Sequence, residues 1–256
     1  MEYAFDPRTG RSLNVDEYKD LYGPKRDARG NVRTRPVLRC LACGVALHSV
    51  AEDSATAVRT WGHDPSPGTY CPIKAEGGER YEVLPPTNVD PAAGEALRTA
   101  FFRRWQKHWG YVRDIAPFAD IFTLIGFLQA ADRTRFWDQR HLEEWHLPYV
   151  FLSTCDFPPP RGKAAALRTE WLRFRFDGRY RTLEDLWIRA APDFRFLRLR
   201  YRVPARRKEP GPVHFIVAEP IAASPAWMAR AYPPALPFAI DKMERAFPRE
   251  LTAPAT

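Results

Sequence analysis

The sequence predicts an α+β fold in which a small strand-rich module, stapled by a metal ion, precedes a larger domain of helices and a short antiparallel sheet. Three observations predict it. Turn-forming stretches interrupt residues 1–90, apolar residues recur at helical spacing after Gly94, and two later segments alternate strictly between polar and apolar residues. With 256 residues, the chain is long enough for one large domain or two modest ones.

The first 90 residues are expected to form short strands joined by turns. The stretches "DPRTG", "YGPKRDARGN", "DPSPG" and "AEGGE" supply Gly, Pro, Asp and Asn, the residues that tight turns favour. Such a segment buries little apolar surface, so it needs a covalent or metal staple. We therefore treat residues 1–90 as a zinc-binding amino-terminal module and residues 91–256 as a second, mixed helix and sheet domain.

The staple is predicted from the cysteines, three of which lie between positions 40 and 71. Cys40 and Cys43 form a C-x2-C knuckle, and His63 and Cys71 follow it. Three thiolates and one imidazole make a closed tetrahedral set, which is typical of structural zinc because it leaves no position for an activated water. His48 is an alternative fourth ligand, ranked second because it sits close behind the knuckle, and buried thiols without metal are the alternative to the site as a whole.

The segment "YAFDPRTGRSLNVDEYK", the knuckle, and "WGHDPSPGTYCP" together resemble the amino-terminal region of the competence protein CoiA family. The resemblance covers residues 2–73 and matches the family's ligands at four positions: Cys40, Cys43, His63 and Cys71. The family's second histidine has no counterpart here, since Trp61 or Asp64 stands near its place. Family members act on DNA and usually carry a nuclease-like domain after the zinc segment, so the resemblance implies a role in handling DNA.

After the stretch "TNVDPAAG", which resembles a linker, the pattern predicts helices. A helical face over 94–109 is formed by Leu97, Phe101, Phe102, Trp105 and Trp109. Two more helices are expected near 118–131 and 133–146, the first of them buried because it is nearly apolar all round. "YVFLS" (149–153) is expected to be a buried strand, Thr182 to cap a short helix, and a last short helix to lie near 239–247 in the Pro-rich carboxyl-terminal part.

The net charge of +8 is concentrated in one block, because residues 161–208 carry 15 Lys and Arg against 5 Asp and Glu. Within it, "WLRFRFD" (171–177) and "FRFLRLRYRV" (194–203) alternate as half-exposed strands do, and "VHFIV" (213–217) follows as a third strand. If the first two strands share a sheet, their arginines project together from its outer face with two aromatic rings. The candidate nucleic-acid-binding residues are Trp171, Arg173, Arg175, Phe196, Arg198, Arg200 and Arg202, extended by Arg206, Arg207 and Lys208 in the next turn.

Two other interpretations of the arginine pattern stay open. An acidic partner protein could pair with the same guanidinium groups, and any solvated sheet face shows outward polar residues. Arginine also dominates the chain, with 32 Arg to 7 Lys, so that part of the pattern reflects composition. The prediction of a polyanionic partner therefore depends on how the two strands pair.

Most catalytic templates are absent from the sequence, which has no G-x-G-x-x-G, P-loop or H-E-x-x-H motif. A metal-dependent nuclease needs an acidic-x-Lys or similar pair, and Asp177–Arg179 comes closest. His141 and His146 are five residues apart and do not share a helical face. Cys155 follows an apolar run and is expected to be a core thiol.

These observations predict a cytoplasmic, non-catalytic, zinc-containing protein that binds nucleic acid, with DNA favoured, in a process such as uptake, recombination or anti-phage defence. The alternatives are a scaffold subunit that docks an acidic protein and a divergent nuclease. The longest apolar run, "IFTLIGFL" (121–128), is too short to span a bilayer, and residues 1–20 lack the apolar run of a secretory signal, so we expect no membrane partner. No small-molecule cofactor is evident.

Overall fold

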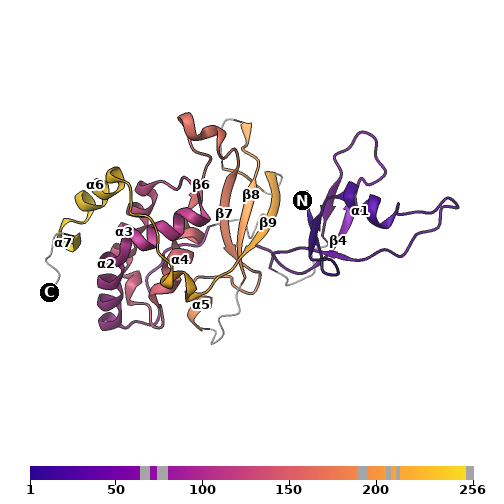
Figure 1. The fold of residues 1–256 in the computed structure, drawn as a ribbon. Coiled ribbons are helices and arrows are strands. Elements are labelled where there is room, and N and C mark those ends of the chain that lie inside the picture. Colours follow the sequence, from indigo (N-terminus) through magenta and orange to yellow (C-terminus); the bar gives the residue numbers. More distant parts are fainter. Residues whose placement is uncertain (64–69, 74–79, 189–194, 206–208, 212–213, 252–256) are drawn as a thin grey trace.

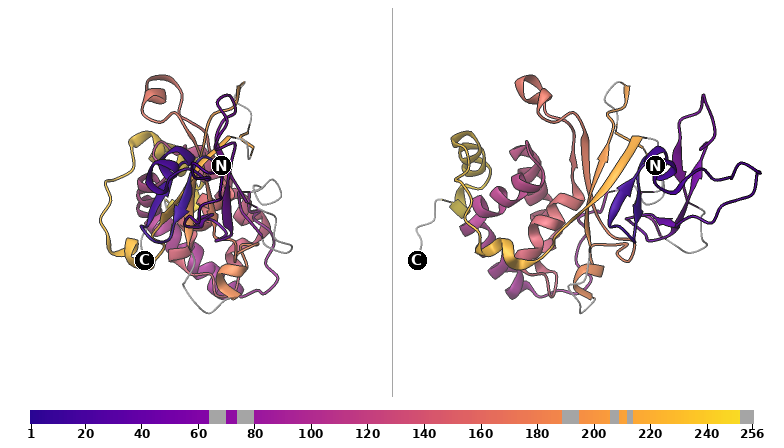
Figure 2. Two further views of the ribbon diagram at one scale, coloured as in Figure 1. Left: turned by 90° about the vertical axis from the view of Figure 1, so that its right-hand side faces the viewer. Right: turned by 45° about the vertical axis from the view of Figure 1, so that its right-hand side comes forward.

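The chain folds into three layers, with a four-stranded antiparallel sheet between a helical layer and a strand-rich amino-terminal module (Figure 1). The view turned by 45° shows the same order of layers (Figure 2). The computed structural model describes residues 1–63, 70–73, 80–188, 195–205, 209–211 and 214–251. The predicted α+β class is confirmed. No helix in these described ranges combines the length and hydropathy needed to cross a membrane.

The amino-terminal module is a five-stranded sheet in the order β2-β1-β3-β4-β5, with one helix beside it. Gly10 closes the turn between the first two strands at a φ of +71°. Asn14 then caps the helix, because its side chain accepts from the backbone of Glu17 while the Glu17 carboxylate accepts from the backbone of Asn14. The elements are β1 (Ala4–Asp6), β2 (Arg11–Leu13), α1 (Val15–Tyr22), β3 (Leu38–Arg39), β4 (Ala46–Val50) and β5 (Thr60–Gly62).

The helical layer begins at Asp90, whose side chain accepts from the backbone of Ala93 and caps the longest helix ahead of Pro91. Its apolar face is the one predicted from the spacing of Leu97 and the aromatic residues after it. The helices are α2 (Pro91–Ile115), α3 (Ile121–Thr134), α4 (Leu147–Thr154), α6 (Pro237–Ala246) and α7 (Pro248–Leu251). Two 3-10 turns connect α3 to α4, η1 (Phe136–Asp138) and η2 (Glu144–His146), and two others follow strands of the central sheet, η3 (Gly162–Ala166) and η6 (Pro225–Ala229).

Two predicted elements are wrong. The helix expected over 133–146 does not form, because α3 ends where Arg135 takes a left-handed conformation and two short 3-10 turns follow. "YVFLS" is not a strand but lies within α4, which Pro148 helps to start at its first turn. A short, fully apolar run fits either a buried strand or a buried helix, and here the helix is buried almost throughout its length.

The central sheet has the strand order β6-β7-β8-β9, all antiparallel. The predicted strands at 171–177, 194–203 and 213–217 correspond to its last three strands, although the third is shifted toward the carboxyl terminus. The short helix α5 (Asp185–Ile188) follows Thr182, whose backbone N–H donates to the Asp185 carboxylate. The strands are β6 (Asp156–Phe157), β7 (Trp171–Phe176), β8 (Phe196–Tyr201) and β9 (Phe215–Ile221).

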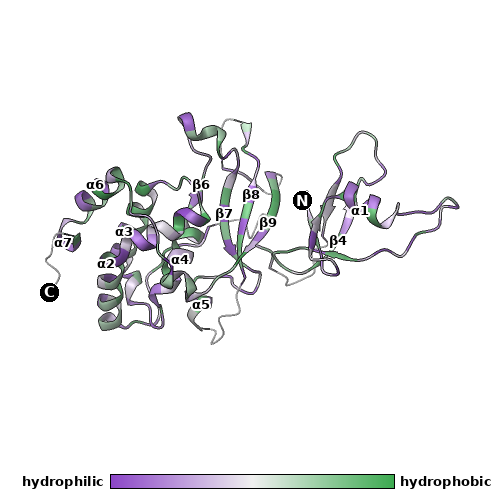
Figure 3. Cartoon of the chain, viewed as in Figure 1, coloured by the Kyte–Doolittle hydropathy of each residue, from purple (hydrophilic) through white to green (hydrophobic). Residues whose placement is uncertain are grey.

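Both faces of this sheet are covered, so it belongs to two hydrophobic cores. On one face, Leu172, Phe174 and Phe196 pack into the core of the helical layer. On the other face, Leu197 and Leu199 pack into the core of the amino-terminal module. Figure 3 shows hydrophobic and hydrophilic residues alternating along β7 and β8. Because both faces are covered, the alternation does not mark an exposed side, and the predicted half-exposed strands are buried over most of their length.

Candidate metal centre and candidate nucleic-acid interface

The four predicted ligands meet in space. One side-chain donor atom from each residue lies within 4.8 Å of the others, and the set is Cys40, Cys43, His63 and Cys71. The sulfur atoms of Cys40 and Cys71 are 3.9 Å apart, close to the separation of roughly 3.8 Å between two sulfurs on one tetrahedral zinc. The cluster therefore has the donor set and spacing of a metal site.

Local backbone geometry aims the two knuckle thiols at one point. The chain leaves β3, and the backbone N–H of Gly44 donates to the carbonyl of Cys40 at 2.7 Å while Cys40 N–H donates to Val45 at 2.8 Å. Gly44 has a φ of +74°, a conformation that favours glycine. This turn brings Cys43 back beside Cys40, and β5 places His63 at its own carboxyl end.

The sulfur atoms are so close that they perturb one another. Hydrogen bonding with Cys43 and Cys71, followed by burial, raises the pKa of the Cys40 thiol. Hydrogen bonds from Cys40 and then Cys71 lower the pKa of Cys43 to about 2. Metal binding requires thiolates, and a cation bound among these sulfur atoms would stabilise the deprotonated form of all three.

His48, the alternative ligand, lies outside the cluster of donor atoms. It stands on β4 directly across from Gly62 and is exposed. A Cβ atom built on Gly62 would be 2.9 Å from the His48 ring, which shows how closely the ring lies over that glycine. The structure therefore favours His63 as the fourth ligand.

The metal centre sits against the central sheet. Cys40 and Cys71 are 1% and 3% exposed and belong to the same core as Leu197 and Leu199 of β8. The backbone N–H of Gly178, in the turn after β7, donates to the carbonyl of Ala42 inside the knuckle at 2.9 Å. The segment that carries the candidate ligands thus contacts the sheet directly.

The predicted arginine surface does not form, because the register separates its members. Arg173 lies across from Leu199 and Arg175 from Leu197, whereas Arg198 lies across from Phe174. Opposite residues in an antiparallel pair share a face, so the arginines of β7 and those of β8 point to opposite sides of the sheet. The expectation that all of them project together is therefore wrong.

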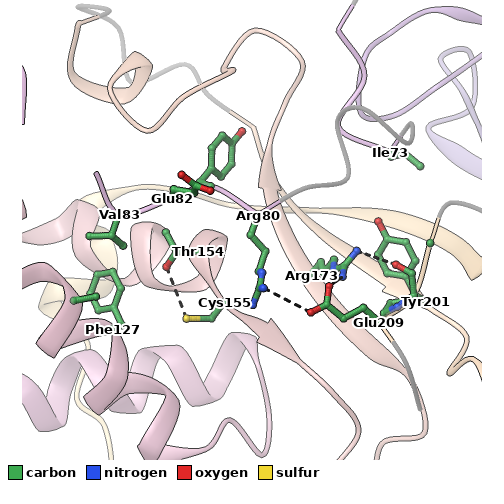
Figure 4. Close-up of a pocket in the computed structure, with 14 residues that line it drawn as sticks. Ile73, Arg80, Glu82, Val83, Phe127, Thr154, Cys155, Arg173, Tyr201 and Glu209 are labelled. Carbon is green, nitrogen blue, oxygen red and sulfur yellow. Dashed lines mark hydrogen bonds and ion pairs between the residues drawn. The ribbon is translucent and has the colours of Figure 1, made fainter. Parts of the chain in front are cut away.

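On β7, the arginines are buried and bound within the protein. Arg173 donates to both carboxylate oxygens of Asp156, at 2.6 and 3.1 Å, to Glu209 at 3.3 Å and to the carbonyl of Pro210 at 2.9 Å. It lines a cavity of about 640 Å³ beside Cys155 and Arg80 (Figure 4). Arg175 is fully buried and donates to the carbonyls of Ser153 and Phe174.

On β8, the arginines are balanced by carboxylates. Arg198 donates to Glu219 at 2.7 Å, and Arg200 donates to the other oxygen of Glu219 at 2.8 Å and to both oxygens of Glu170. Arg202 donates to Glu2 at 2.5 Å. These contacts leave β8 with no continuous positive strip among its described residues.

The two aromatic rings proposed for base stacking are buried, Trp171 at 7% and Phe196 at 0% exposure, so their faces belong to the two cores. The extension of the predicted surface lies outside the described residues, at Arg206, Arg207 and Lys208. Neither ring can therefore stack on an unpaired base while the sheet is intact.

A basic element that the sequence alone did not indicate lies in the amino-terminal module. Residues 24–34 form an exposed hairpin, here called the basic arm, that extends away from the body of the molecule between α1 and β3 (Figures 1 and 2). It carries one acidic residue, Asp27, and four exposed cations: Lys25, Arg26, Arg29 and Arg33. The net charge of residues 1–100 does not indicate this arm, because acidic residues elsewhere in the module offset its cations.

The basic arm has a defined conformation. Arg26 and Val32 form an antiparallel bridge, and the Asp27 carboxylate accepts from the backbone of Arg29 at 2.8 Å and of Asn31 at 2.9 Å. At its base, Arg35 forms a two-point ion pair with buried Glu52, at 2.7 and 2.8 Å. The Asp27 carboxylate therefore stabilises the turn, and the four cations lie on an ordered loop.

The Glu52 carboxylate, which is ionised, binds the base of the arm. Burial alone would raise its pKa, but hydrogen bonds from Arg35 and Ser49 outweigh burial and lower the pKa to about 2. The same carboxylate accepts from the backbone N–H of Lys25 at 3.1 Å. The arm is thus attached, through one ionised carboxylate, to the turn that follows β4.

Other residues singled out in the sequence have structural partners. Both oxygens of Asp177 accept from Arg179, and one also accepts from the backbone of Arg195, so this carboxylate is committed to its own turn. Burial raises the pKa of the Cys155 thiol to about 12, which fits the predicted core thiol. Among the described residues, the Cys and His centre is the one group of three or more such donors close enough to hold a metal ion.

Comparisons of the chain with protein-family models, with curated proteins and with solved structures found no match. The resemblance of residues 2–73 to the CoiA family therefore stays a prediction from the residues themselves. The function is accordingly inferred from the geometry of the metal centre and of the basic arm.

Proposed function

We propose that the protein is a non-catalytic, zinc-containing nucleic-acid-binding accessory protein, with DNA as the favoured partner in uptake, recombination or defence. The observation that carries this proposal is the basic arm, an ordered and exposed hairpin with four cations and one carboxylate. This surface takes the place of the arginine strip expected from the sequence. The strip's own arginines stabilise the fold.

The metal ion in this proposal is structural zinc. Three sulfur ligands and one nitrogen complete a tetrahedral shell, which is the arrangement of zinc sites that hold a fold together. Zinc binding of this kind contributes on the order of 10 kcal/mol to folding. The module has few long elements, its strands being two to five residues in length, so a contribution of this size matters for its stability.

The chemistry of the arm fits a phosphate backbone. Arginine forks and the lysine ammonium donate to phosphate oxygens, and each neutralised phosphate releases counterions. The side chains of Arg29 and Arg33 are exposed and have no carboxylate partner within the described part of the chain. An exposed cation that forms no internal ion pair gives up less on binding an external anion than the paired arginines of β8 would.

Fluorescence anisotropy with single-stranded and double-stranded DNA, across a salt series, tests the proposal on the zinc-loaded full chain. We expect binding that weakens with salt, and a triple variant R26Q/R29Q/R33Q whose salt slope for duplex DNA is smaller by about 2–3. The matched control removes three cations at the other end of the molecule, as R133Q/R245Q/R249Q. Circular dichroism and thermal unfolding check that both variants remain folded.

No binding at low salt, or equal binding by the arm variant and the control, would overturn the proposal. A scaffold role would give a different pattern, in which an acidic protein is retained by the wild type after nuclease treatment and lost by the arm variant. Arg198 and Arg200 are poor test positions, because both belong to one ion-pair network: removing Arg198 takes away one of the two partners of Glu219, and removing Arg200 leaves Glu170 without its partner.

A further inference from the structure

A second cationic site lies at the opposite end of the molecule, on the outer side of the helical layer. It is a cavity of about 800 Å³ between α2, α7 and the connection from η6 to α6. We call it the α2 groove, and its lining includes Thr99, Arg103, Arg104, Lys107, Arg230 and Tyr232. Its volume falls within the range of roughly 300–1,000 Å³ typical of small-ligand sites.

The groove carries an excess of positive charge. Four of its lining residues are Lys or Arg, and Glu250 is its one carboxylate, which is itself paired with Arg98 at 2.7 Å. Arg104 is bound to Glu144, and Arg230 lies 3.0 Å from Asp114. Even with these pairs counted, two cations of the groove are not neutralised within the described residues.

Those two cations are Arg103 and Lys107, which flank the kink in α2 at Arg104 and both line the groove. No carboxylate among the described residues lies within ion-pair distance of either side chain. Thr99 lies four residues before Arg103 and adds a hydroxyl group to the lining of the groove.

The walls of the groove are fixed by specific contacts, so the site is formed before any ligand arrives. A Cβ atom on Gly110 would lie 2.5 Å from Tyr232 Cβ, so the glycine lets the connection cross close to α2. The backbone N–H of Ala235 donates to Gln106 at 3.1 Å. At the other end, the Arg98–Glu250 pair holds α7 against α2.

The lining also has an apolar portion. Phe102 and Trp105 form part of the floor, and Tyr232, Pro233 and Pro234 form a wall opposite the helix. The Arg230 guanidinium lies 5.2 Å from the Tyr232 ring centre. A ligand that fits would therefore combine a multiply charged anionic end with a compact, partly apolar body.

We propose that the α2 groove binds a small molecule that carries a phosphate chain, of the size of a nucleotide. Arg103 and Lys107 bind the phosphate oxygens, Thr99 donates a further hydrogen bond, and the body of the ligand lies against Tyr232 and the two prolines. The site is distinct from the basic arm, so this inference stands or falls independently of the proposed function.

Isothermal titration calorimetry of the full, zinc-loaded chain tests the inference with three probes: ATP, inorganic pyrophosphate and adenosine. We expect ATP and pyrophosphate to bind and adenosine not to bind measurably. The variant R103Q/K107Q should weaken ATP binding at least about tenfold, since each charge-assisted hydrogen bond contributes that much or more. Circular dichroism and thermal unfolding check that this variant remains folded.

Two control variants test whether ATP binds in the α2 groove and not at other cationic surfaces. R113Q/R133Q removes the same charge from exposed positions that do not line the groove, and should leave ATP affinity unchanged. The arm variant R26Q/R29Q/R33Q should also leave it unchanged. If neither ATP nor pyrophosphate binds, or if R103Q/K107Q binds them as wild type does, the inference is overturned. Binding of an oligo-glutamate peptide in place of both phosphates would also overturn it and point to an acidic protein partner.

Discussion

Gly178 and Ala42 join the two halves of the molecule through one backbone hydrogen bond of 2.9 Å, in which the Gly178 N–H is the donor. Ala42 lies between the two knuckle cysteines, and Gly178 lies in the turn that leaves β7. A Cβ atom on Gly178 would be 2.7 Å from the carbonyl oxygen of Tyr70, next to the ligand Cys71. The metal centre and the sheet therefore meet at a point where only glycine fits.

The first prediction concerns this close approach. Gly178→Ala should destabilise the protein by about 1–3 kcal/mol, because the added methyl group overlaps backbone that cannot rotate away. Urea unfolding measures the loss. Gly126→Ala is the matched control: Gly126 is exposed within α3 and a methyl group added there would have no atoms within 4 Å, so this change should stabilise by about 1 kcal/mol. Equal effects of the two substitutions would contradict the contact.

The second prediction concerns the metal. Elemental analysis of the purified chain should find one zinc ion per molecule, and Cys71→Ser should yield metal-poor protein that is insoluble or sensitive to protease. His48→Ala should keep the full zinc content, because His48 lies outside the donor cluster. Loss of zinc from the His48 variant, with zinc retained after His63→Ala, would show that the fourth ligand is assigned incorrectly.

The third prediction separates structural arginines from surface ones. Arg173→Met should cost about 3–5 kcal/mol, because it leaves the buried carboxylate of Asp156 without its close partner. Adding Asp156→Asn should recover part of this loss, so the double variant is more stable than Arg173→Met alone. Arg202→Met should cost at most about 1 kcal/mol, since its pair with Glu2 is solvent-exposed. Denaturant unfolding of these variants beside the wild type and Asp156→Asn completes the comparison.

The fourth prediction concerns acid sensitivity. Burial lowers the pKa of His146 to about 4, and burial also lowers the pKa of His108 despite its hydrogen bond to Glu144. Since these folded-state values lie below the unfolded value of about 6.5, the unfolded chain binds protons more readily. Stability should therefore be full above pH 6.5 and fall as the pH drops toward 4. Between pH 7.5 and 5, His146 alone should account for about 2 kcal/mol.

Urea unfolding midpoints measured from pH 7.5 to 5 test this dependence. His146→Gln should flatten the slope relative to wild type, which separates the effect of this ring from acid release of the metal. His141→Asn is the control, because His141 is exposed and takes a left-handed conformation that asparagine tolerates. A slope that is unchanged in His146→Gln would argue that the buried ring is not the source.

The cluster of candidate metal ligands could be predicted because its signal is local. Two cysteines at C-x2-C spacing before a glycine dictate a knuckle, and the remaining His and Cys in the same segment complete the donor set. The helix α2 could also be predicted from the sequence, since its apolar residues recur at helical spacing. Both features depend on the spacing of residues that are close together in the chain, and this spacing can be read from one sequence.

The arginine surface could not be predicted, because it depends on register. Alternation shows that Arg173 and Arg198 each lie on one face of its own strand, but not whether those faces coincide. A shift of one residue in pairing reverses the answer, and here Arg198 pairs with Phe174. Alternation also cannot show that both faces of the sheet are covered, one by the helical layer and the other by the amino-terminal module.

Because both faces of the central sheet are covered, the chain cannot be cut into two separately folded fragments without exposing apolar surface. A shortened chain that began after residue 90 would uncover Leu197, Leu199 and Phe215, which now lie beneath the amino-terminal module. That exposed apolar face would favour self-association over a soluble fragment. The leading 90 residues, in turn, would lose the surface against which their cysteines are seated. Each portion therefore depends on the other to stay folded, and neither is a natural unit for isolated expression.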